Sequence, residues 1–273
     1  MKEFVKKNLS FTIFAVLAIL IILVAIFAPL VTGGVDPTVG SLSDAMQGPS
    51  ADHIFGTDKL GRDVFARVIY GARTSLVAAF SVVIIIFVLG TLLGILAGYF
   101  GGIVDTIIMR ISDMMVSFPG MVLAIAIAGI LGASIQNAVI AVSMVSWTKY
   151  ARLARSLVLK IRHRDYVAAA VVTGSKTPYI LRKYMLPNVL PTLVITGATD
   201  IGSMMLELAG LSFLGFGAQA PTPEWGLMLN EGRAMMQAAP WLMIFPGLAI
   251  FIVVVVFNLL GDGLRDILDP RDE

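Results

Sequence analysis

The sequence predicts an all-α membrane protein, a single transmembrane domain over residues 1–273 whose chain crosses the bilayer six times. Three observations predict this class. Hydrophobic residues make up 58% of the chain, charged residues make up only 14%, and long uncharged runs recur along its length. The charged share is about half that of a soluble domain. Because a helix needs about 20 apolar residues to cross the hydrocarbon core, the uncharged runs are candidate transmembrane helices.

The first candidate helix covers about 11–31 and contains no charged residue. It is longer than the apolar core of a secretory signal peptide, and no small-residue cleavage site clearly closes it. We therefore expect a retained transmembrane helix rather than a cleaved leader. A polar outer segment, 32–73, follows it.

The remaining spans are separated by charges, glycines and prolines. The uncharged run 114–148 is too long for one helix and breaks at residues 131–134, where the sequence reads Leu-Gly-Ala-Ser. With this break, the expected spans after the first are about 74–100, 105–131, 134–152, 188–214 and 240–261.

A basic segment between the fourth and fifth spans decides the orientation. Lys and Arg near helix ends resist translocation and stay in the cytoplasm. The termini add Lys2, Lys6, Lys7 and Arg271 on the same side, so we expect both termini inside, an N-in, C-in topology. Against the single acid Asp165, the segment carries nine basic residues: Lys149, Arg152, Arg155, Lys160, Arg162, Arg164, Lys176, Arg182 and Lys183.

The sequence lacks the motifs of enzymes and metal sites. There is no cysteine, and the two histidines, His53 and His163, are far apart. No G-x-x-x-x-G-K-S/T loop, G-x-S-x-G elbow or H-E-x-x-H pair is present, so no catalytic residue and no metal ligand is assigned. The net charge of +2 gives no basis for a nucleic-acid partner, and membrane lipid is the expected surrounding.

Within the basic segment, Tyr166–Thr173 is rich in alanine and predicts a short helix that Gly174 ends in the left-handed conformation. Pro178 bars simple continuation. A second short helix over 179–186 is expected to stop at Pro187. Such a pair of helices on the cytoplasmic face either docks in a groove of a partner or lies as an interfacial loop held by anionic lipids.

This segment resembles the EAA loop of ABC-transporter permeases, where two alanines are followed four residues later by glycine and then by Leu-Pro. Ala168 stands where that family most often has glutamate, so the resemblance implies no salt bridge from this position to an ATPase. Tyr184 replaces an aliphatic residue of the pattern. The resemblance makes 153–187 a cytoplasmic coupling loop with these ATPase-coupling residues: Tyr166, Ala169, Ala170, Gly174, Leu186 and Pro187.

Four further stretches, in order along the chain, are similar to signatures of the dipeptide/oligopeptide/nickel permease family, and within it to the C-type subunit: 55–76, 97–125, 206–233 and 257–271. The resemblance implies an ABC importer permease fold in a bacterial or archaeal cytoplasmic membrane. It also implies a homologous second permease subunit, two cytoplasmic ABC ATPase subunits and an extracytoplasmic solute-binding protein. ATP and Mg are then bound by the partner ATPases, and this chain holds no cofactor.

Two acids in the fifth span are the candidate pathway residues. Asp200 and Glu207 are seven residues apart and share one helix face. Ionisable groups inside a span are costly, so they pair with protein or face a water-filled path. Either Asp200 bonds a neighbouring helix, or both acids form a stripe along the translocation pathway that favours a cationic group.

The substrate class stays open at this point. Residues 200–205 resemble the nickel branch of the family somewhat more than the dipeptide branch, so nickel or a metal chelate is favoured slightly over a di- or oligopeptide. The methionine pairs, at 114–115, 204–205 and 235–236, are interpreted as packing filler rather than as metal contacts. The alternative from another class is a secondary transporter or channel that needs no ATPase, although no internal repeat supports it. A purely structural scaffold explains neither the acids nor the segment 164–187.

Two local patterns predict contacts of the helices. Gly90, Gly94 and Gly98 are spaced by four and predict a face for close helix contact. Arg110 and Asp113 are placed for an ion pair within one helix.

On the outer side, Leu60, Val64, Phe65 and Val68 fall at helical spacing. They predict an amphipathic helix that packs on the bundle or meets a solute-binding protein. Trp225, which follows a proline-rich loop, is placed at the outer membrane interface, where Trp is common.

Overall fold

The computed structural model describes residues 8–268, and each regular element in that range is a helix. Besides short 3-10 turns at Leu42–Asp44 and Arg233–Met235 and a π-helical turn at Leu181–Met185, the helices are: α2 (Leu9–Ile26), α3 (Ala28–Val31), α4 (Val64–Phe100), α5 (Gly102–Val116), α6 (Gly120–Leu131), α7 (Ile135–Ile161), α8 (Asp165–Val172), α9 (Thr177–Ile180), α10 (Leu186–Phe213), α11 (Trp225–Gly232) and α12 (Trp241–Leu268).

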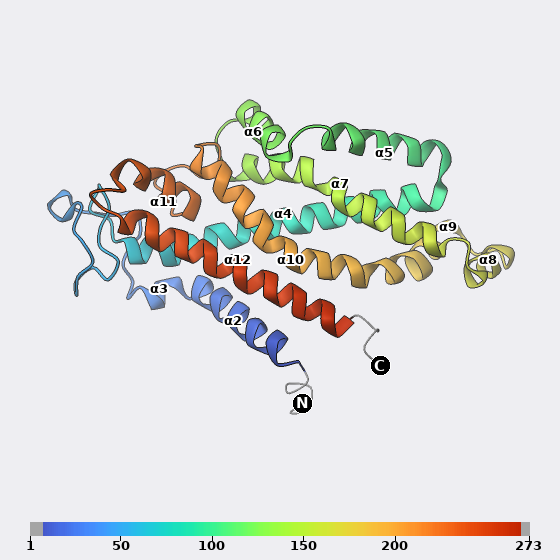
Figure 1. Ribbon diagram of the computed structural model, residues 1–273, viewed down its shortest axis with the longest axis horizontal. Helices are drawn as coiled ribbons and strands as arrows, with labels where there is room; N and C mark the ends of the chain where they lie inside the picture. The colour runs from blue at the N-terminus through green and yellow to red at the C-terminus, as the bar shows by residue number, and fades with distance from the viewer. Residues whose placement is uncertain (1–7, 269–273) are drawn as a thin grey trace.

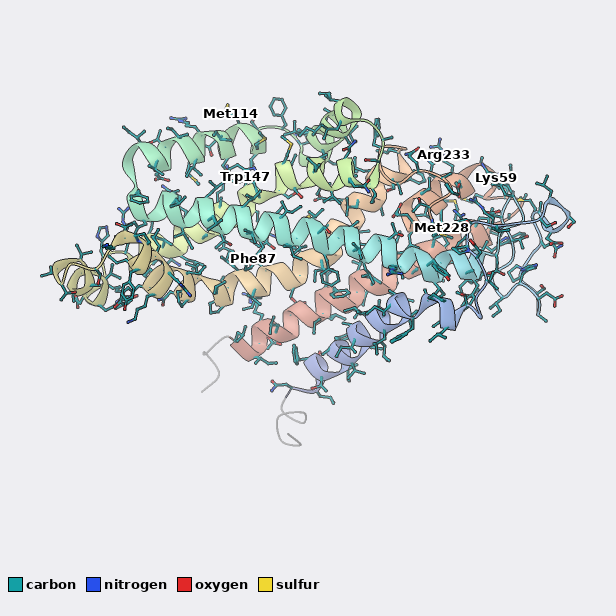
Figure 2. All side chains as sticks on the ribbon, turned by 180° about the vertical axis from the view of Figure 1, so that it is seen from behind. Lys59, Phe87, Met114, Trp147, Met228 and Arg233 are labelled. Atoms are coloured by element: carbon teal, nitrogen blue, oxygen red, sulfur yellow. The ribbon has the colours of Figure 1, made fainter. Side chains whose placement is uncertain are left out.

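The long helices lie lengthwise in an elongated bundle (Figure 1). Helix α4 packs against α7 and α10, and α12 packs against α10 and α2. The short helices α8 and α9 lie at one end of the bundle. Helix α11 and the segment 32–63 lie at the opposite end, where Figure 2 also places Lys59 and Arg233. The two ends therefore have different structures, which is expected of a protein that faces two compartments.

Four helical stretches within the described residues are long and apolar enough to cross a membrane: Leu9–Ile26, Val64–Phe100, Thr177–Phe213 and Trp241–Leu268. The pair α5 and α6, bent by 92°, is a fifth if it counts as one broken span. Helix α7, the fourth expected span, carries Lys149, Arg152, Arg155 and Lys160 in its second half. The membrane class is confirmed. The six-span count and the N-in, C-in orientation stay predictions, and Lys2, Lys6, Lys7 and Arg271 lie outside the described residues.

Helix α4 begins inside the segment expected to be polar and outer. The side chain of Asp63 caps it by accepting a hydrogen bond of 2.8 Å from the Ala66 N–H. Val64 and Val68 are buried against the bundle, so the packing interpretation of this amphipathic stretch is confirmed, while Leu60 lies exposed before the helix. This first part of α4 contains the charged residue Arg67, so a search for uncharged runs does not find it. Arg67 is nevertheless buried in the fold.

The expected stop at Pro187 does not occur, because the helix continues from α9 into α10 through the π-helical turn 181–185. A proline in a regular helix loses one hydrogen bond and its ring clashes with the carbonyl four residues earlier. The carbonyl concerned belongs to Lys183, within the wider turn, which gives the Pro187 ring room. Pro191 also lies inside α10 without ending it.

The glycine face of α4 contacts α7, as predicted. A side-chain carbon at Gly94 would lie 2.7 Å from the Ala154 Cβ, and one at Gly98 would lie 2.8 Å from the Val158 Cβ. Gly90 faces Tyr150 in the same way. The absence of these side chains lets the two helix backbones approach closely.

Two ion pairs fasten α5 to α7. Arg152 donates a hydrogen bond of 2.9 Å to Asp113, and Arg155 donates one of 2.6 Å to Asp105. The expected pair within α5, between Arg110 and Asp113, is therefore wrong. Helix α7 lies beside α5 and offers Asp113 a guanidinium from another element, which spacing within one helix does not reveal.

Candidate functional site

The helix expected over Tyr166–Thr173 forms as α8, which lies at one end of the molecule and follows α7 and precedes α10 in the chain (Figure 1). Gly174 follows it with a φ of 81°, the left-handed conformation that favours glycine. The Gly174 N–H donates to the Val171 carbonyl and the Ser175 N–H donates to the Ala170 carbonyl, both at 3.0 Å. These bonds satisfy carbonyls at the helix end, as in a Schellman motif. The helix and its glycine terminator are confirmed.

Helix α8 has one buried side and one exposed apolar side. Val167 and Ala170 are buried, whereas Ala169 is exposed and Val172 is 86% exposed. The two alanines of the resemblance thus play different parts: Ala170 holds α8 to the bundle, and Ala169 presents a small side chain outward. Exposed apolar side chains of this kind suit contact with either a partner protein or the membrane surface, the two alternatives that the sequence leaves open.

The second half of this segment packs through aromatic rings. The centroids of Tyr166 and Tyr184 are 5.8 Å apart, and those of Tyr179 and Tyr184 are 6.3 Å apart. Leu186 is half-buried and Pro187 is exposed. Tyr184, noted only as a departure from the sequence pattern, therefore joins α8 to the start of α10.

A hollow of about 540 Å³ lies between α8 and the end of α4. Tyr99 and Phe100 of α4 line one side, His163 lies at its edge, and Val171 and Val172 of α8 line the other. An inserted side chain from a partner would meet mainly apolar and aromatic groups there. The predicted ATPase-coupling residues thus lie together on one end of the molecule, beside a hollow.

A second cavity, of about 520 Å³, lies further along the bundle and contains both predicted pathway acids. Its walls come from four parts of the chain. Ile86 belongs to α4, Phe118 to the α5–α6 bend, Lys149 to α7, and Asp200 and Glu207 to α10. Its volume is in the usual range for a small-molecule site.

Asp200 is paired, and its partner was not predicted. Lys149 of α7 donates a hydrogen bond of 2.7 Å to Asp200 Oδ1. The Asp200 side chain is 5% exposed and the Lys149 side chain is 59% exposed, so the ammonium shields a buried carboxylate. The interpretation that Asp200 bonds a neighbouring helix is confirmed. The sequence assigned Lys149 to the cytoplasmic basic segment only, although an unpaired acid within a span is a signal to seek a basic partner.

The remaining cavity wall is mostly apolar and hydroxyl-bearing. Met204 is buried beside Asp200, as expected of packing filler, but Met114 and Met236 are exposed, so that interpretation is wrong for them. Among the described residues, no group of three His, Cys, Asp or Glu side chains is placed to hold a metal ion. The chemistry of the cavity is that of one ammonium and two carboxylates.

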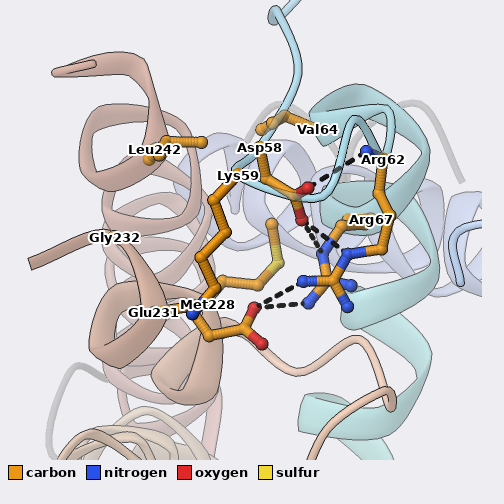
Figure 3. A pocket seen from close by; sticks show the side chains of 9 residues that line it. All are labelled: Asp58, Lys59, Arg62, Val64, Arg67, Met228, Glu231, Gly232 and Leu242. Atoms are coloured by element: carbon orange, nitrogen blue, oxygen red, sulfur yellow. Dashed lines mark hydrogen bonds and ion pairs between the residues drawn. The ribbon is translucent and has the colours of Figure 1, made fainter. Parts of the chain in front are cut away.

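At the opposite end, four charged side chains form a buried network (Figure 3). Arg62 is 2% exposed and Arg67 is 1% exposed. Arg62 donates to Asp58 at 2.6 Å, and both arginines donate to Glu231, at 3.1 and 2.8 Å. The space between them is only about 20 Å³, which is enough for about one water molecule. The network fastens the segment 32–73 to α11 and leaves no room for a substrate.

Helix α11 is also anchored to α4. Trp225 is 2% exposed, and its indole N–H donates a hydrogen bond of 2.9 Å to the Val68 carbonyl. Its expected place at the membrane interface is therefore wrong, because the ring fills the space over Gly71. Glu224 caps α11 by accepting from the Gly226 N–H at 2.9 Å. Burial raises the pKa of the Glu224 carboxyl, against the opposing effect of its capping hydrogen bonds.

The sequence is similar to those of known transport proteins. Residues 90–272 match the family described as binding-protein-dependent transport system inner membrane component. The dipeptide transport system permease protein DppC of Alkalihalophilus pseudofirmus is 46% identical over 266 residues, covering 97% of this chain and 87% of that protein. The glutathione transport system permease protein GsiD of Pectobacterium atrosepticum is 47% identical over 225 residues, covering 82% of this chain and 75% of that protein.

A solved structure shares the fold. It is an inward-facing conformation of the MetNI methionine ABC transporter, with a TM-score of 0.61 and 18% identity, and the match covers 76% of this chain and 98% of that one. The helical arrangement is therefore that of an ABC importer permease. Together with the family match and the two relatives, this fold makes the chain a transport protein rather than an enzyme. The chain belongs to the family of binding-protein-dependent transport system inner membrane components, the permeases of ABC importers.

Proposed function

We propose that the chain is one permease subunit of an ATP-driven importer of small peptides, in the cytoplasmic membrane of a bacterium or archaeon. One observation carries this proposal. Helices α7 and α10 line the charged cavity and also flank the exposed segment α8–α9. One pair of helices thus links a place for substrate to a place for a partner that supplies energy.

Peptides are favoured over nickel or a metal chelate for two reasons. The relatives described above are named for dipeptides and for glutathione, which is itself a small peptide. In addition, the lining of the cavity contains, among the described residues, no histidine, the side chain that best suits nickel. The resemblance of residues 200–205 to the nickel branch is weaker than either reason.

The proposed assembly contains a homologous second permease, two cytoplasmic ATPases that bind ATP and Mg, and an extracytoplasmic solute-binding protein. In this assembly α8–α9 faces the cytoplasm, the chain is N-in and C-in, and α5 with α6 counts as one of six spans. The exposed Ala169 side of α8 meets the ATPase. Tyr166 of α8 packs against Tyr184, Leu186 is half-buried at the start of α10, and Gly174 and Pro187 shape the connection from α8 to α10.

Asp200 and Glu207 are proposed to line the translocation pathway, because both border the 520 Å³ cavity. Transport in this chain involves no covalent chemistry. ATP binding and hydrolysis in the partners would move α8–α9, and α7 and α10 would carry that motion to the cavity.

The test is uptake by a strain that lacks this chain, restored with a plasmid copy. We expect ATP-dependent uptake of labelled dialanine to return with the natural chain, and labelled nickel uptake to be unaffected. Ala169→Arg should abolish the return, because a large charged side chain blocks the exposed docking side of α8. Ser50→Arg, an equally exposed position at the other end, is the matched control and should restore uptake fully.

Two results would contradict the proposal. Dialanine uptake that depends on this chain but survives ATP depletion would favour a secondary transporter or channel. Loss of nickel uptake alone in the deletion strain would restore the metal interpretation.

A further inference from the structure

The 520 Å³ cavity beside α10 has an ammonium at one end and a carboxylate at the other, and the separation of these groups indicates the length of a matching ligand. Lys149 supplies the positive end. Its ammonium has three N–H donors, and the structure shows one of them bonded, to Asp200. With its side chain 59% exposed, the ammonium has donors left for an acceptor in the cavity.

Glu207 supplies the negative end. It borders the same cavity, and within residues 8–268 its carboxylate has no hydrogen bond or ion pair to the protein. Asp200 and Glu207 lie on one face of α10, two turns apart, which is a rise of about 10 Å along the helix. The Lys149–Asp200 pair is neutral as a whole, so the groups that remain to meet a ligand are the exposed Lys149 ammonium, through its remaining N–H donors, and the Glu207 carboxylate, which is unpaired among the described residues.

This separation matches a short peptide. Two extended residues span at most about 7 Å and three span about 10 Å. A charged hydrogen bond of about 2.8 Å at one or both ends brings the reach of a dipeptide to about the helix rise between Asp200 and Glu207. Between them, Ser203 and the apolar Met204 and Ile86 form a wall that takes small side chains without selecting one.

We propose that this cavity holds a zwitterionic peptide of two or three residues by its two ends, with the carboxylate on Lys149 and the ammonium on Glu207. Asp200 is then a positioning residue that keeps the Lys149 ammonium in place. The arrangement disfavours a simple anion, which Glu207 repels, and the described part of its lining contains no histidine or cysteine to bind a bare transition-metal cation. The proposal rests on the peptide-import function above and assigns to named residues the part of the substrate that each one recognises.

The test compares three substrates in the complete transporter reconstituted into proteoliposomes with its binding protein: dialanine, dialanine amide and N-acetyl-dialanine. The amide lacks the anionic end, and the acetylated peptide lacks the cationic end. Because the same binding protein serves each permease variant, its own preference cancels when the uptake ratios of a variant and the natural chain are compared.

Each substitution should change the preference for one end only. Lys149→Met should lower dialanine uptake about tenfold and remove the preference over the amide, while the preference over the acetylated peptide remains. Glu207→Gln should also lower dialanine uptake, but it should remove the preference over the acetylated peptide and keep the preference over the amide. Lys160→Met on α7 and Asp262→Asn on α12 change exposed charges that do not border the cavity, and are expected to keep both preferences.

Lys149→Arg is the control for a merely structural effect of Lys149→Met. It keeps the positive charge and should therefore keep the preference for a free carboxylate. Co-purification of the ATPases reports assembly for each variant. If Lys149→Met and Glu207→Gln lower uptake of the three substrates equally, or if Lys149→Arg also loses the preference, the end-recognition proposal is overturned while peptide import stands. If the natural chain shows no ATP-dependent dialanine uptake at all, both proposals fail.

Discussion

Two arginines are buried at the α11 end of the protein, where an unpaired charge would be costly. Arg62 and Arg67 are each within reach of Asp58 and Glu231. A buried ion pair adds little net stability compared with apolar residues of the same size, but removing one partner strands a charge and costs about 3–5 kcal/mol. The network therefore fixes the segment 32–73 in one position rather than contributing much to overall stability.

Glu231→Gln tests this argument. It removes the carboxylate shared by the two arginines and leaves Asp58 as their one acid partner. We expect the free energy of unfolding to fall by up to about 3 kcal/mol, since Glu231 is partly exposed and some of the cost is screened. Thermal unfolding of the detergent-purified protein measures the change. Lys59→Gln, an exposed neighbour, should stay within about 0.5 kcal/mol, and an equal loss there would refute the argument.

Residue-level predictions from the sequence were right where the cause is local. Gly174 ends α8 because its own backbone conformation requires glycine. They failed where the partner comes from a distant part of the chain. Glu231, which accepts a hydrogen bond from Arg67, is 164 residues away from it, and the carbonyl that binds Trp225 is 157 residues away. Lys149 was missed as the partner of Asp200 for the same reason, since no local spacing connects residues 51 positions apart.

At the scale of elements, the close contact of α4 with α7 organises the bundle. A side chain at Gly94 would meet the Ala151 carbonyl and the Ala154 Cβ, and both belong to a packed helix that has little freedom to move. Glycine in a helix costs about 1 kcal/mol relative to alanine. Overpacking a tight contact costs about 1–3 kcal/mol, so the clash outweighs the gain from the better helix former.

Two glycine substitutions should therefore differ in their effect on the melting temperature. Gly94→Ala should lower the melting temperature, because α4 and α7 must separate to admit the methyl group. Gly247→Ala in α12 adds the same methyl where the nearest atom, Leu229 Cδ2, is 4.0 Å away, and should leave the melting temperature unchanged or raise it. Differential scanning fluorimetry of the two variants gives the comparison. An equal fall in the melting temperature of both variants would contradict the argument that the close contact at Gly94 causes the loss.

Hydrophobic runs predicted that the long helices exist, but not where they begin and end. Helix α4 begins at Val64 because Asp63 caps it and an ion network neutralises Arg67. Helix α10 continues past Pro187 because a π-helical turn precedes the proline. In both places a tertiary or backbone feature overrides the rule that charges and prolines end a span. Such features appear only when the whole fold is known.

At the scale of the whole molecule, the proposed mechanism depends on which end faces the cytoplasm. The α8–α9 end carries the exposed apolar side that would meet an ATPase, and the α11 end carries the closed ion network. Helices α7 and α10 connect α8–α9 with the Lys149–Asp200 pair, so a displacement at the tip would reach the cavity through two rigid elements. The reverse orientation would place the docking side outside the cell and make this coupling impossible.

The absence of cysteine makes the orientation directly measurable, because an introduced cysteine is the only thiol of the chain. Lys176→Cys, at the exposed α8–α9 end, should react with a membrane-impermeant maleimide only after the cells are opened. Ser50→Cys, exposed at the opposite end, should react in intact cells. Because both residues are exposed in the folded chain, a difference in labelling reports sidedness rather than burial. Labelling of Lys176→Cys in intact cells would place α8–α9 outside and exclude its contact with cytoplasmic ATPases.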